Sequence, residues 1–179
     1  MEPIQIADMV KEQFPDEVLD IKDFRDQVAI TVKKDRIVEL CRYLHDEPSL
    51  FFDFPADLFG IDYLGKKENR FAVAYNLYSV RHRHRIVLKA EVAESSPTID
   101  SVLPVWAGVN WHERECYDLF GITFTGHPDL RRILLPEGWE GHPLRKDYPL
   151  QGPGPDQEWQ GFTDVLDRAK RFKEFEWHG

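Results

Sequence analysis

Cysteine is scarce in this sequence: only Cys41 and Cys116 occur among its 179 residues. An iron–sulfur cluster usually needs four ligands, most of them cysteine, so we do not expect this chain to hold one. A disulfide between the two cysteines is conceivable, but two buried thiols are the favoured interpretation, since disulfides are rare in reducing compartments. If the chain serves a redox enzyme, other chains must carry its clusters.

Long apolar runs are also missing. No stretch approaches the ~20 consecutive apolar residues that a membrane-spanning helix needs. The first ten residues, MEPIQIADMV, have no basic region ahead of an apolar one, so we do not expect a signal peptide. Any association with a membrane is therefore expected to occur through another subunit.

Positive charge is in short supply as well. The chain has 23 lysines and arginines against 32 aspartates and glutamates, which gives a formal net charge of -9. A general nucleic-acid binder usually shows a basic face, and electrostatic docking on anionic lipid needs one too, so both classes are disfavoured. With 42% hydrophobic and 31% charged residues, the composition is that of one ordinary globular domain with a core.

The first third of the chain predicts a helix, a strand and a second helix. Apolar residues at helical spacing indicate a helix over residues 4–14, and alternation indicates a strand over residues 18–34. Asp35 is the expected cap of the second helix, whose apolar face extends to Leu44.

The middle of the chain predicts further strands. Residues 51–54 indicate a short strand, followed by a turn and a second short extended piece before Gly65. Residues 71–80 and 85–93 alternate between apolar and polar side chains and indicate two longer strands. The pattern predicts an α+β fold: a two-layer domain with a mostly antiparallel or mixed sheet and helices on one face.

A longer helix is predicted over residues 98–120, with Ser101 as its N-terminal cap and Gly121 as its C-terminal cap. Glu113 falls at the centre of the apolar stripe of this helix. A buried carboxyl group has to be protonated or paired, and we expect an arginine of this chain or of a neighbour as its partner.

The rest of the chain is predicted to be an extended arm with a terminal helix. Residues 126–135 indicate a short turn of helix, and glycines and prolines over 136–149 block regular structure. Residues 151–156, QGPGPD, are typical of a linker, and residues 163–177 indicate an amphipathic helix that docks either on a partner or on its own domain. The predicted division is a core domain at 1–125 and a partner-binding arm at 126–179.

Residues 111–150 combine charges of both signs with aromatic residues and prolines. A free loop does not need that mixture, whereas a surface that fixes paired charges against a partner does. Trp111 falls on the polar side of its helix with Glu115 and Asp118, which favours an interface, and Arg145 is expected to make a two-pronged contact with a carboxylate. The predicted partner-interface or ion-pair residues are Trp111, Glu113, Arg114, Glu115, Asp118, His127, Arg131, Arg132, Arg145, Lys146 and Asp147.

No catalytic or metal-binding motif emerges. His82 and His84 would share a face of a strand, but no third ligand lies near them in the sequence, so a solvated hairpin tip is favoured over a metal site. His112 and Cys116 lie one helical turn apart, yet Cys116 borders the buried stripe, which favours a structural thiol over a nucleophile. We therefore expect no catalytic residue, cofactor ligand or metal ligand in this chain.

Three long motifs stand close together: ERECYDLFG at residues 113–121, HPDLRRIL at 127–134 and PLRKDY at 143–148. They resemble the signature of the C subunit of NADH:quinone oxidoreductase, respiratory complex I. Motifs of this length are far more specific than a single short glycine pattern. The resemblance implies a non-redox structural subunit in the peripheral arm of a proton-translocating enzyme that passes electrons from NADH to quinone.

The resemblance also implies where the chemistry of such an enzyme lies. It implies packing against the D subunit, the large quinone-site subunit, and against its neighbours, with flavin, iron–sulfur clusters and quinone in those partners and none in this chain. It implies a peripheral position on the cytoplasmic side of a bacterial cell membrane, reached only through the complex. Two alternatives stay open: the homologous subunit of a related membrane-bound hydrogenase or other donor:quinone oxidoreductase, and, more distantly, a stand-alone metal enzyme that uses His82, His84, His112 or His127.

Overall fold

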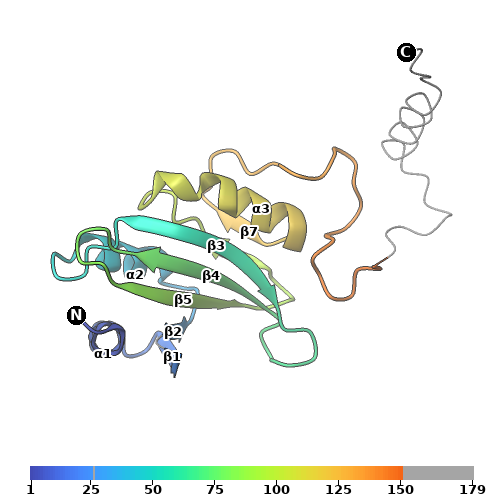
Figure 1. The fold of residues 1–179 in the computed structure, drawn as a ribbon. Coiled ribbons are helices and arrows are strands. Elements are labelled where there is room, and N and C mark those ends of the chain that lie inside the picture. The colour runs from blue at the N-terminus through green and yellow to red at the C-terminus, as the bar shows by residue number, and fades with distance from the viewer. Residues whose placement is uncertain (26, 151–179) are drawn as a thin grey trace, which may run out of the picture.

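The computed structural model describes residues 1–25 and 27–150 of the chain. Its centre is a five-stranded sheet with the strand order β1-β2-β5-β4-β3, and two further short strands, β6 and β7, pair with each other (Figure 1). The elements in chain order are α1 (Pro3–Gln13), β1 (Val18–Phe24), β2 (Gln27–Val32), α2 (Ile37–Asp46), β3 (Phe54–Asp62), β4 (Phe71–Tyr78), β5 (Arg85–Val92), β6 (Thr98–Asp100), the 3-10 helix η1 (Ala107–Val109), α3 (Asn110–Phe120) and β7 (Thr123–Thr125).

Neighbouring strands of the large sheet run antiparallel, except that β2 and β5 run parallel. Parallel neighbours need a long connection, and here α2 and the β3–β4 hairpin lie between β2 and β5 in the sequence. The predicted α+β class with a mixed sheet is therefore confirmed.

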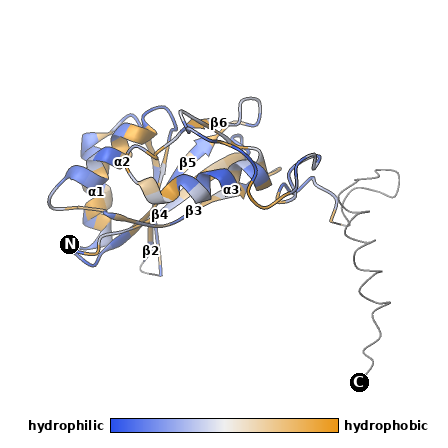
Figure 2. Cartoon of the chain, turned by 90° about the horizontal axis from the view of Figure 1, so that it is seen from above, coloured by the Kyte–Doolittle hydropathy of each residue, from blue (hydrophilic) through white to orange (hydrophobic). Residues whose placement is uncertain are grey.

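One hydrophobic core joins the sheet to the helices. Along β5 the side chains alternate as the two-residue period of a strand requires, and α1, α2 and α3 each contribute apolar residues to the same core. In Figure 2 the apolar and polar residues of α1 and α2 form separate bands along each helix. The core residues from β5 are Ile86, Leu88, Ala90 and Val92.

The predicted single strand over residues 18–34 is wrong, because β1 and β2 form an antiparallel hairpin. The chain turns after β1, where Arg25 has a φ of 54°, a left-handed conformation that few non-glycine residues adopt. No glycine or proline in this segment marks the turn, so the sequence carries no turn signal between the two strands.

The two short extended pieces predicted around residues 51–65 are instead one strand, β3. The expected strand at residues 51–54 is wrong, since Phe51 has a φ of 42° and only Phe54 belongs to β3. Pro55 is tolerated because β3 is an edge strand and its pairing register shifts at a bulge beside this residue. Gly60 lies directly under the ring of Phe120, which brings α3 close to the sheet.

The predicted helix over residues 98–120 is wrong in its first half. That half holds β6, a turn and η1, and only Asn110–Phe120 form an α-helix. Ser101 does not cap a helix, because its hydroxyl group donates to the carboxyl group of Glu113. Gly121 ends α3 as predicted, with a left-handed φ of 70°.

Two smaller predictions also fail. Arg36, and not Asp35, occupies the N-cap position of α2. Residues 126–135 form turns and bends in place of the predicted turn of helix. The predicted linker at 151–156 and the predicted helix at 163–177 lie outside the described residues.

The close approach of β3 and α3 generates a first prediction. A Cβ atom at Gly60 would lie 2.6 Å from Cδ2 of Phe120, so Gly60→Ala should lower the free energy of unfolding by about 1–3 kcal/mol. Urea denaturation of the purified chain measures this loss. Gly108→Ala is the control, because a Cβ there meets no atom within 4 Å and should change stability by no more than about 0.5 kcal/mol. Equal losses in the two variants would contradict the tight packing.

Candidate partner interface

The candidate interface consists of α3 and of residues 126–150, which we call the strap. The strap contains no helix and no strand, so its backbone N–H and C=O groups need partners outside a regular ladder. Charged side chains of α3 supply several of these partners. The charged motifs of the sequence therefore first serve to fix the strap on its own domain.

Asp118 makes the densest set of these contacts. Its side chain is fully buried, and Oδ2 accepts the backbone N–H groups of Ile133, Leu134 and Leu135 at 3.0, 2.8 and 2.8 Å. Oδ1 accepts a hydrogen bond from Nη1 of Arg132 at 2.9 Å. Burial opposes the charge on Asp118, but the three N–H donors and Arg132 outweigh it and lower its pKa. The sequence predicts Asp118 on the polar side of the helix, as an interface or ion-pair residue, and the strap buries it there in an ion pair with Arg132.

Arg114 holds the same part of the strap through the opposite charge. Its Nε and Nη2 donate to the carbonyl oxygens of Arg131 and Arg132 at 3.0 and 3.1 Å. Its guanidinium lies 5.1 Å from the ring centre of Trp111, a cation–π contact. Trp111 itself remains 60% exposed, as predicted for the polar side of α3.

The C-terminal end of α3 is covered by the later part of the strap. Nδ1 of His142 lies 2.8 Å from the carbonyl oxygen of Asp118, and Nε of Arg145 donates to the carbonyl oxygen of Phe120 at 2.6 Å. These carbonyls belong to the last turn of a helix, where an arginine also complements the helix dipole. Within the described residues Arg145 forms no ion pair with a carboxylate and bonds this backbone carbonyl instead, so its two-pronged contact with a carboxylate of a partner stays a prediction.

Glu113 faces the core and is fully buried, as predicted. Its partners are neutral: the Ser101 hydroxyl group lies 2.6 Å from Oε2, and the backbone N–H of Val102 donates to Oε1 at 2.8 Å. The predicted pairing with an arginine is wrong, since Arg132 bonds Asp118 and Arg145 bonds Phe120. Burial without a counter-ion raises the pKa of Glu113 to about 7.

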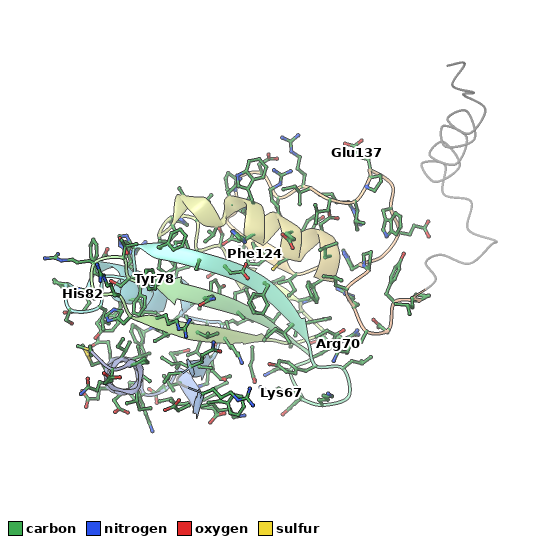
Figure 3. All side chains as sticks on the ribbon, viewed as in Figure 1. Lys67, Arg70, Tyr78, His82, Phe124 and Glu137 are labelled. Carbon is green, nitrogen blue, oxygen red and sulfur yellow. The ribbon has the colours of Figure 1, made fainter. Side chains whose placement is uncertain are left out.

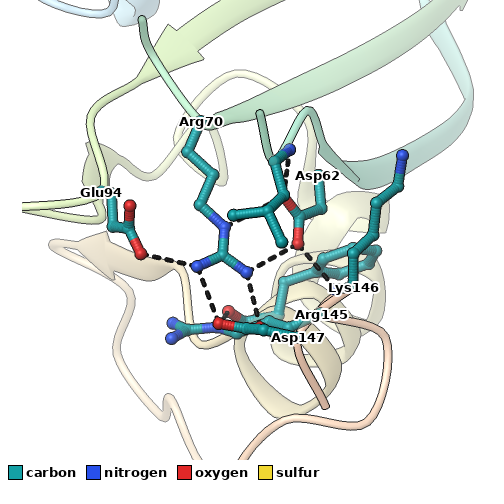
Figure 4. A network of polar contacts seen from close by, with 8 residues as sticks. Asp62, Arg70, Glu94, Arg145, Lys146 and Asp147 are labelled. Carbon is teal, nitrogen blue, oxygen red and sulfur yellow. Dashed lines mark hydrogen bonds and ion pairs between the residues drawn. The ribbon is translucent and has the colours of Figure 1, made fainter. Parts of the chain in front are cut away.

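A second cluster ties the end of the strap to the sheet, around Arg70 (Figure 4). Arg70 precedes β4 and is 4% exposed. Its Nε and Nη2 donate to the two carboxylate oxygens of Asp62 at 3.0 and 2.9 Å, while Nη1 and Nη2 reach those of Asp147 at 3.0 and 2.6 Å. Nη1 also donates to Glu94 at 2.6 Å. One guanidinium thus holds the end of β3, the segment after β5 and the strap together.

Asp62 completes this cluster with backbone contacts. It is 5% exposed and accepts the N–H groups of Leu64 and Lys146 at 2.9 and 2.8 Å. Burial alone would raise its pKa, but the hydrogen bonds from Arg70 and from these N–H groups outweigh it and hold the pKa at about 2. Sequence reasoning missed Asp62, Arg70 and Glu94. No local pattern could have found them, because Arg70 and Asp147 are 77 positions apart.

The other predicted residues lie toward solvent. Glu115, Arg131 and Lys146 are exposed, and Arg131 pairs with Asp129 at 3.1 Å on the surface. His127 is half-buried, and its Nδ1 accepts the backbone N–H of Asp129. Three leucines of the strap are also exposed: Leu134 at 61%, Leu144 at 51%, and Leu150, which is fully exposed. The outer surface therefore combines Trp111 and these leucines with a few charges.

The histidines and cysteines have other partners. Nε2 of His82 and Nε2 of His84 lie 2.8 and 2.7 Å from the carbonyl oxygens of Pro48 and Leu50, and His84 is buried, so the predicted solvated hairpin tip is wrong for that residue. Cys41 and Cys116 are buried free thiols, and burial raises the pKa of each. Within residues 1–25 and 27–150, no group of three His, Cys, Asp or Glu side chains is placed to hold a metal ion.

No helix in the described part of the chain has both the length and the apolar character needed to cross a bilayer.

Sequence comparison gives one consistent result. The family model for the respiratory-chain NADH dehydrogenase 30 kDa subunit matches residues 30–154. The C subunit of the NADH-quinone oxidoreductase of Geobacter metallireducens is 53% identical over 145 residues, which cover 81% of this chain and 88% of that protein. The corresponding C subunit of Roseiflexus castenholzii is 48% identical over 161 residues, which cover 90% and 89% of the two chains.

Two solved structures share the fold. The trypsin-resistant fragment of Nqo5 is 30% identical, superposes with a TM-score of 0.62, and covers 73% of this chain and 100% of its own. A chain of the membrane-bound sulfane sulfur reductase, an archaeal respiratory membrane complex, superposes with a TM-score of 0.68 and covers 98% and 96% of the two chains. Its identity is 18%, so this second similarity concerns the fold alone.

The raised pKa of Glu113 predicts a pH-dependent stability. Glu113 changes from its ordinary pKa of 4.5 in the unfolded chain to about 7 in the folded chain. The folded state therefore binds more protons between these values, and stability should fall as pH rises through this window, by about 3 kcal/mol in all. Glu113→Gln keeps a donor and an acceptor for Ser101 and Val102, so this fall should disappear.

Urea denaturation of both proteins at pH 5, 6, 7 and 8 measures this difference. The glutamine variant should match the wild type near pH 5 and exceed it near pH 8. If the free energy of unfolding changes equally with pH in the two proteins, Glu113 does not titrate in this range. That result would contradict its burial among neutral partners.

Removal of Arg70 should lower the free energy of unfolding, because a buried carboxylate loses its counter-ion. Arg70→Met leaves Asp62 buried beside backbone donors but without its counter-ion, and should lower the free energy of unfolding by about 3–5 kcal/mol. Arg131→Met is the matched control: it removes an exposed ion pair and should change stability by no more than about 1 kcal/mol. Chemical denaturation compares the two, and similar losses would mean that the Arg70 cluster does not hold the strap.

Proposed function

The chain belongs to the family of the 30 kDa subunit of respiratory-chain NADH dehydrogenase, and from this premise we propose that it is a structural subunit in the peripheral arm of an NADH:quinone oxidoreductase. The surface formed by α3 and the strap would pack on the large quinone-site subunit, the D subunit, and on its neighbours. The whole complex would carry out electron transfer from NADH to quinone, coupled to proton translocation. This chain would take part by holding the quinone-reducing module together.

The observation that carries this proposal is that the polar groups of the strap bond within the chain, while large apolar side chains of α3 and the strap are exposed. The strap's inward backbone groups are bound by Asp118 and Arg114, and its Asp147 is paired with Arg70, all inside the chain. The outer surface of α3 and the strap includes large apolar side chains, of which Trp111 on α3 and Leu134 on the strap are each about 60% exposed. Trp is enriched among the residues that dominate binding energy, and apolar residues presented on a fixed backbone lose little entropy on binding. A surface of this kind is suited to permanent contact with another subunit.

The same proposal assigns the redox chemistry to partner subunits. Flavin, iron–sulfur clusters and quinone would be bound there, while the polar groups of α3 and the strap maintain shape. Glu113 and Asp118 accept hydrogen bonds from this chain itself, which suits positioning of the backbone better than proton transfer to a substrate. The chain would lie at the cytoplasmic side of the membrane, attached to it through the complex.

One related function is supported by a specific observation. The same fold occurs in a chain of the membrane-bound sulfane sulfur reductase, so this scaffold serves more than one respiratory complex. A related hydrogenase or another donor:quinone oxidoreductase would use such a subunit in the same way, with the electron donor set by other chains. The relatives near 50% identity favour NADH as the donor.

Co-purification tests the proposed interface. The tagged chain would be expressed in its own cells, and membranes would be solubilised gently. Trp111→Ser combined with Leu134→Ser should reduce recovery of the other subunits at least about tenfold, because an exposed anchor of this type is worth ~2 kcal/mol or more. Phe59→Ser is the control, since Phe59 is 42% exposed on β3 and belongs neither to α3 nor to the strap.

The proteins that arrive with the wild-type chain decide between the two functions. Recovery of flavin and iron–sulfur subunits with NADH:quinone activity would support the proposal. Recovery of hydrogenase subunits would show that the complex uses an electron donor other than NADH. Recovery of the wild-type chain alone, or equal loss in the Phe59 control, would contradict the proposed surface.

A further inference from the structure

A second distinctive surface lies at the opposite end of the sheet from the Arg70 cluster. Figure 3 shows Arg70 at one end of the sheet and His82 at the other. We call residues 80–85 there the arginine turn; they span most of the connection between β4 and β5 and the first residue of β5. Its three arginines, Arg81, Arg83 and Arg85, are exposed, and none has a carboxylate within ion-pair distance in the described part of the chain. Three exposed cations in five residues stand out on a chain with a net charge of -9.

The backbone of the arginine turn is held in one conformation. Arg83 has a φ of 55°, a left-handed conformation unusual for a residue with a side chain. Ser79 fixes this bend, because its carbonyl oxygen accepts the N–H of Arg83 at 2.8 Å and its Oγ accepts the N–H of His82 at 3.2 Å. The N–H of Ser79 donates in turn to the carbonyl oxygen of His84 at 3.0 Å.

A neighbouring loop fixes the arginine turn from outside. Nε2 of His82 lies 2.8 Å from the carbonyl oxygen of Pro48, and Nε2 of His84 lies 2.7 Å from that of Leu50. The two imidazole rings stack with their centres 5.4 Å apart. The histidines of the RHRHR segment thus bind backbone, and their role is to hold the arginines in place. Strained backbone that its surroundings keep in one form is a recurrent feature of binding surfaces.

Exposed apolar side chains adjoin the arginines. Val80 is 58% exposed and Phe54 is 51% exposed, and Asp53, next to Phe54, accepts the N–H of Val80 at 2.9 Å. The guanidinium of Arg81 lies 5.9 Å from the ring centre of Phe51. Arginine and aromatic residues are enriched in protein–protein interfaces, and their apolar neighbours exclude water around the charges.

Acidic residues beside this surface form no ion pair with its arginines within the described residues. Oδ1 of Asp53 accepts the N–H of Val80. Asp46 lies against His45, with Oδ1 and Nδ1 2.7 Å apart. The arginine turn therefore remains a local site of positive charge, suited to carboxylates on another surface.

We propose that the arginine turn is a second docking surface of this chain, and that it binds a carboxylate-rich surface of another protein subunit in the same complex. The proposal rests on the assembly proposed above and concerns the end of the domain that α3 and the strap do not cover. A protein partner is favoured over anionic lipid or nucleic acid for two reasons. Val80 and Phe54 offer apolar contact, and the net negative charge of the chain opposes extended polyanions.

Zero-length cross-linking tests the chemistry of the partner directly. Arg83→Lys introduces a primary amine that a water-soluble carbodiimide joins only to a carboxylate in direct contact. The purified wild-type and variant complexes would be treated, and cross-linked peptides would be identified by mass spectrometry. Arg42→Lys is the matched control, because Arg42 is also exposed but lies on α2. The expected result is a link from position 83, but not from position 42, to an Asp or Glu of a co-purified subunit.

Charge reversal provides an independent measurement. Arg81→Glu with Arg83→Glu should leave the unfolding midpoint of the free chain near that of the wild type. It should reduce retention of the chain in the complex about tenfold at moderate salt, while the double replacement by lysine restores retention.

Three results would overturn the proposal. The first is the absence of a link from position 83 in a complex that is otherwise intact, which would leave the proposed function standing. The second is flotation of the free chain with phosphatidylglycerol vesicles that the charge reversal abolishes, which would assign the arginines to lipid. The third is purification of the wild-type chain without any other subunit, which would overturn both proposals.

Discussion

The buried carboxylate of Asp118 is the contact on which the candidate interface depends. It accepts three consecutive backbone N–H groups of the strap and pairs with Arg132. A segment without helix or strand has no ladder of its own to satisfy these groups, so one fixed acceptor on α3 takes the place of a ladder. Because α3 is itself fixed over Gly60 by close packing, the position of Leu134 follows from the position of the sheet.

Three buried acidic residues differ in their hydrogen-bond partners, and these partners determine whether each side chain stays charged and binds the strap. Glu113 has only neutral partners, and its pKa is raised to about 7. Asp118 has three N–H donors and an arginine, and its pKa is lowered. Asp62 shares Arg70 with the strap residue Asp147, and its pKa is held at about 2. The last two acids remain charged and bind the strap, while Glu113 stabilises the segment before α3, so only apolar anchors and a few charges are left for a partner.

Local pattern predicted much of this fold, and contacts between distant residues account for what it missed. The helices near residues 4–14 and 37–46 and the two long central strands follow from periodicity, which depends on neighbours in sequence. The helix expected over residues 98–120 failed because β6 pairs with β7, about 25 positions later, which no local window detects. Of the predicted residues, Asp118, Arg132 and Asp147 take part in ion pairs that hold the strap, but the pairings were not predicted. Glu113 has no arginine partner, and Arg70 lies outside every motif.

Amide hydrogen exchange of residues 133–135 in the purified chain tests most directly whether α3 fixes the strap. These three amides lie in irregular backbone, and among residues 1–25 and 27–150 only the carboxylate of Asp118 accepts hydrogen bonds from all three. The expected result is exchange far slower than in an unstructured peptide, and loss of that protection in Asp118→Ala while the amides of β4 stay protected. Exchange of the wild-type amides at the rate of an unstructured peptide would contradict a strap that is fixed before any partner binds.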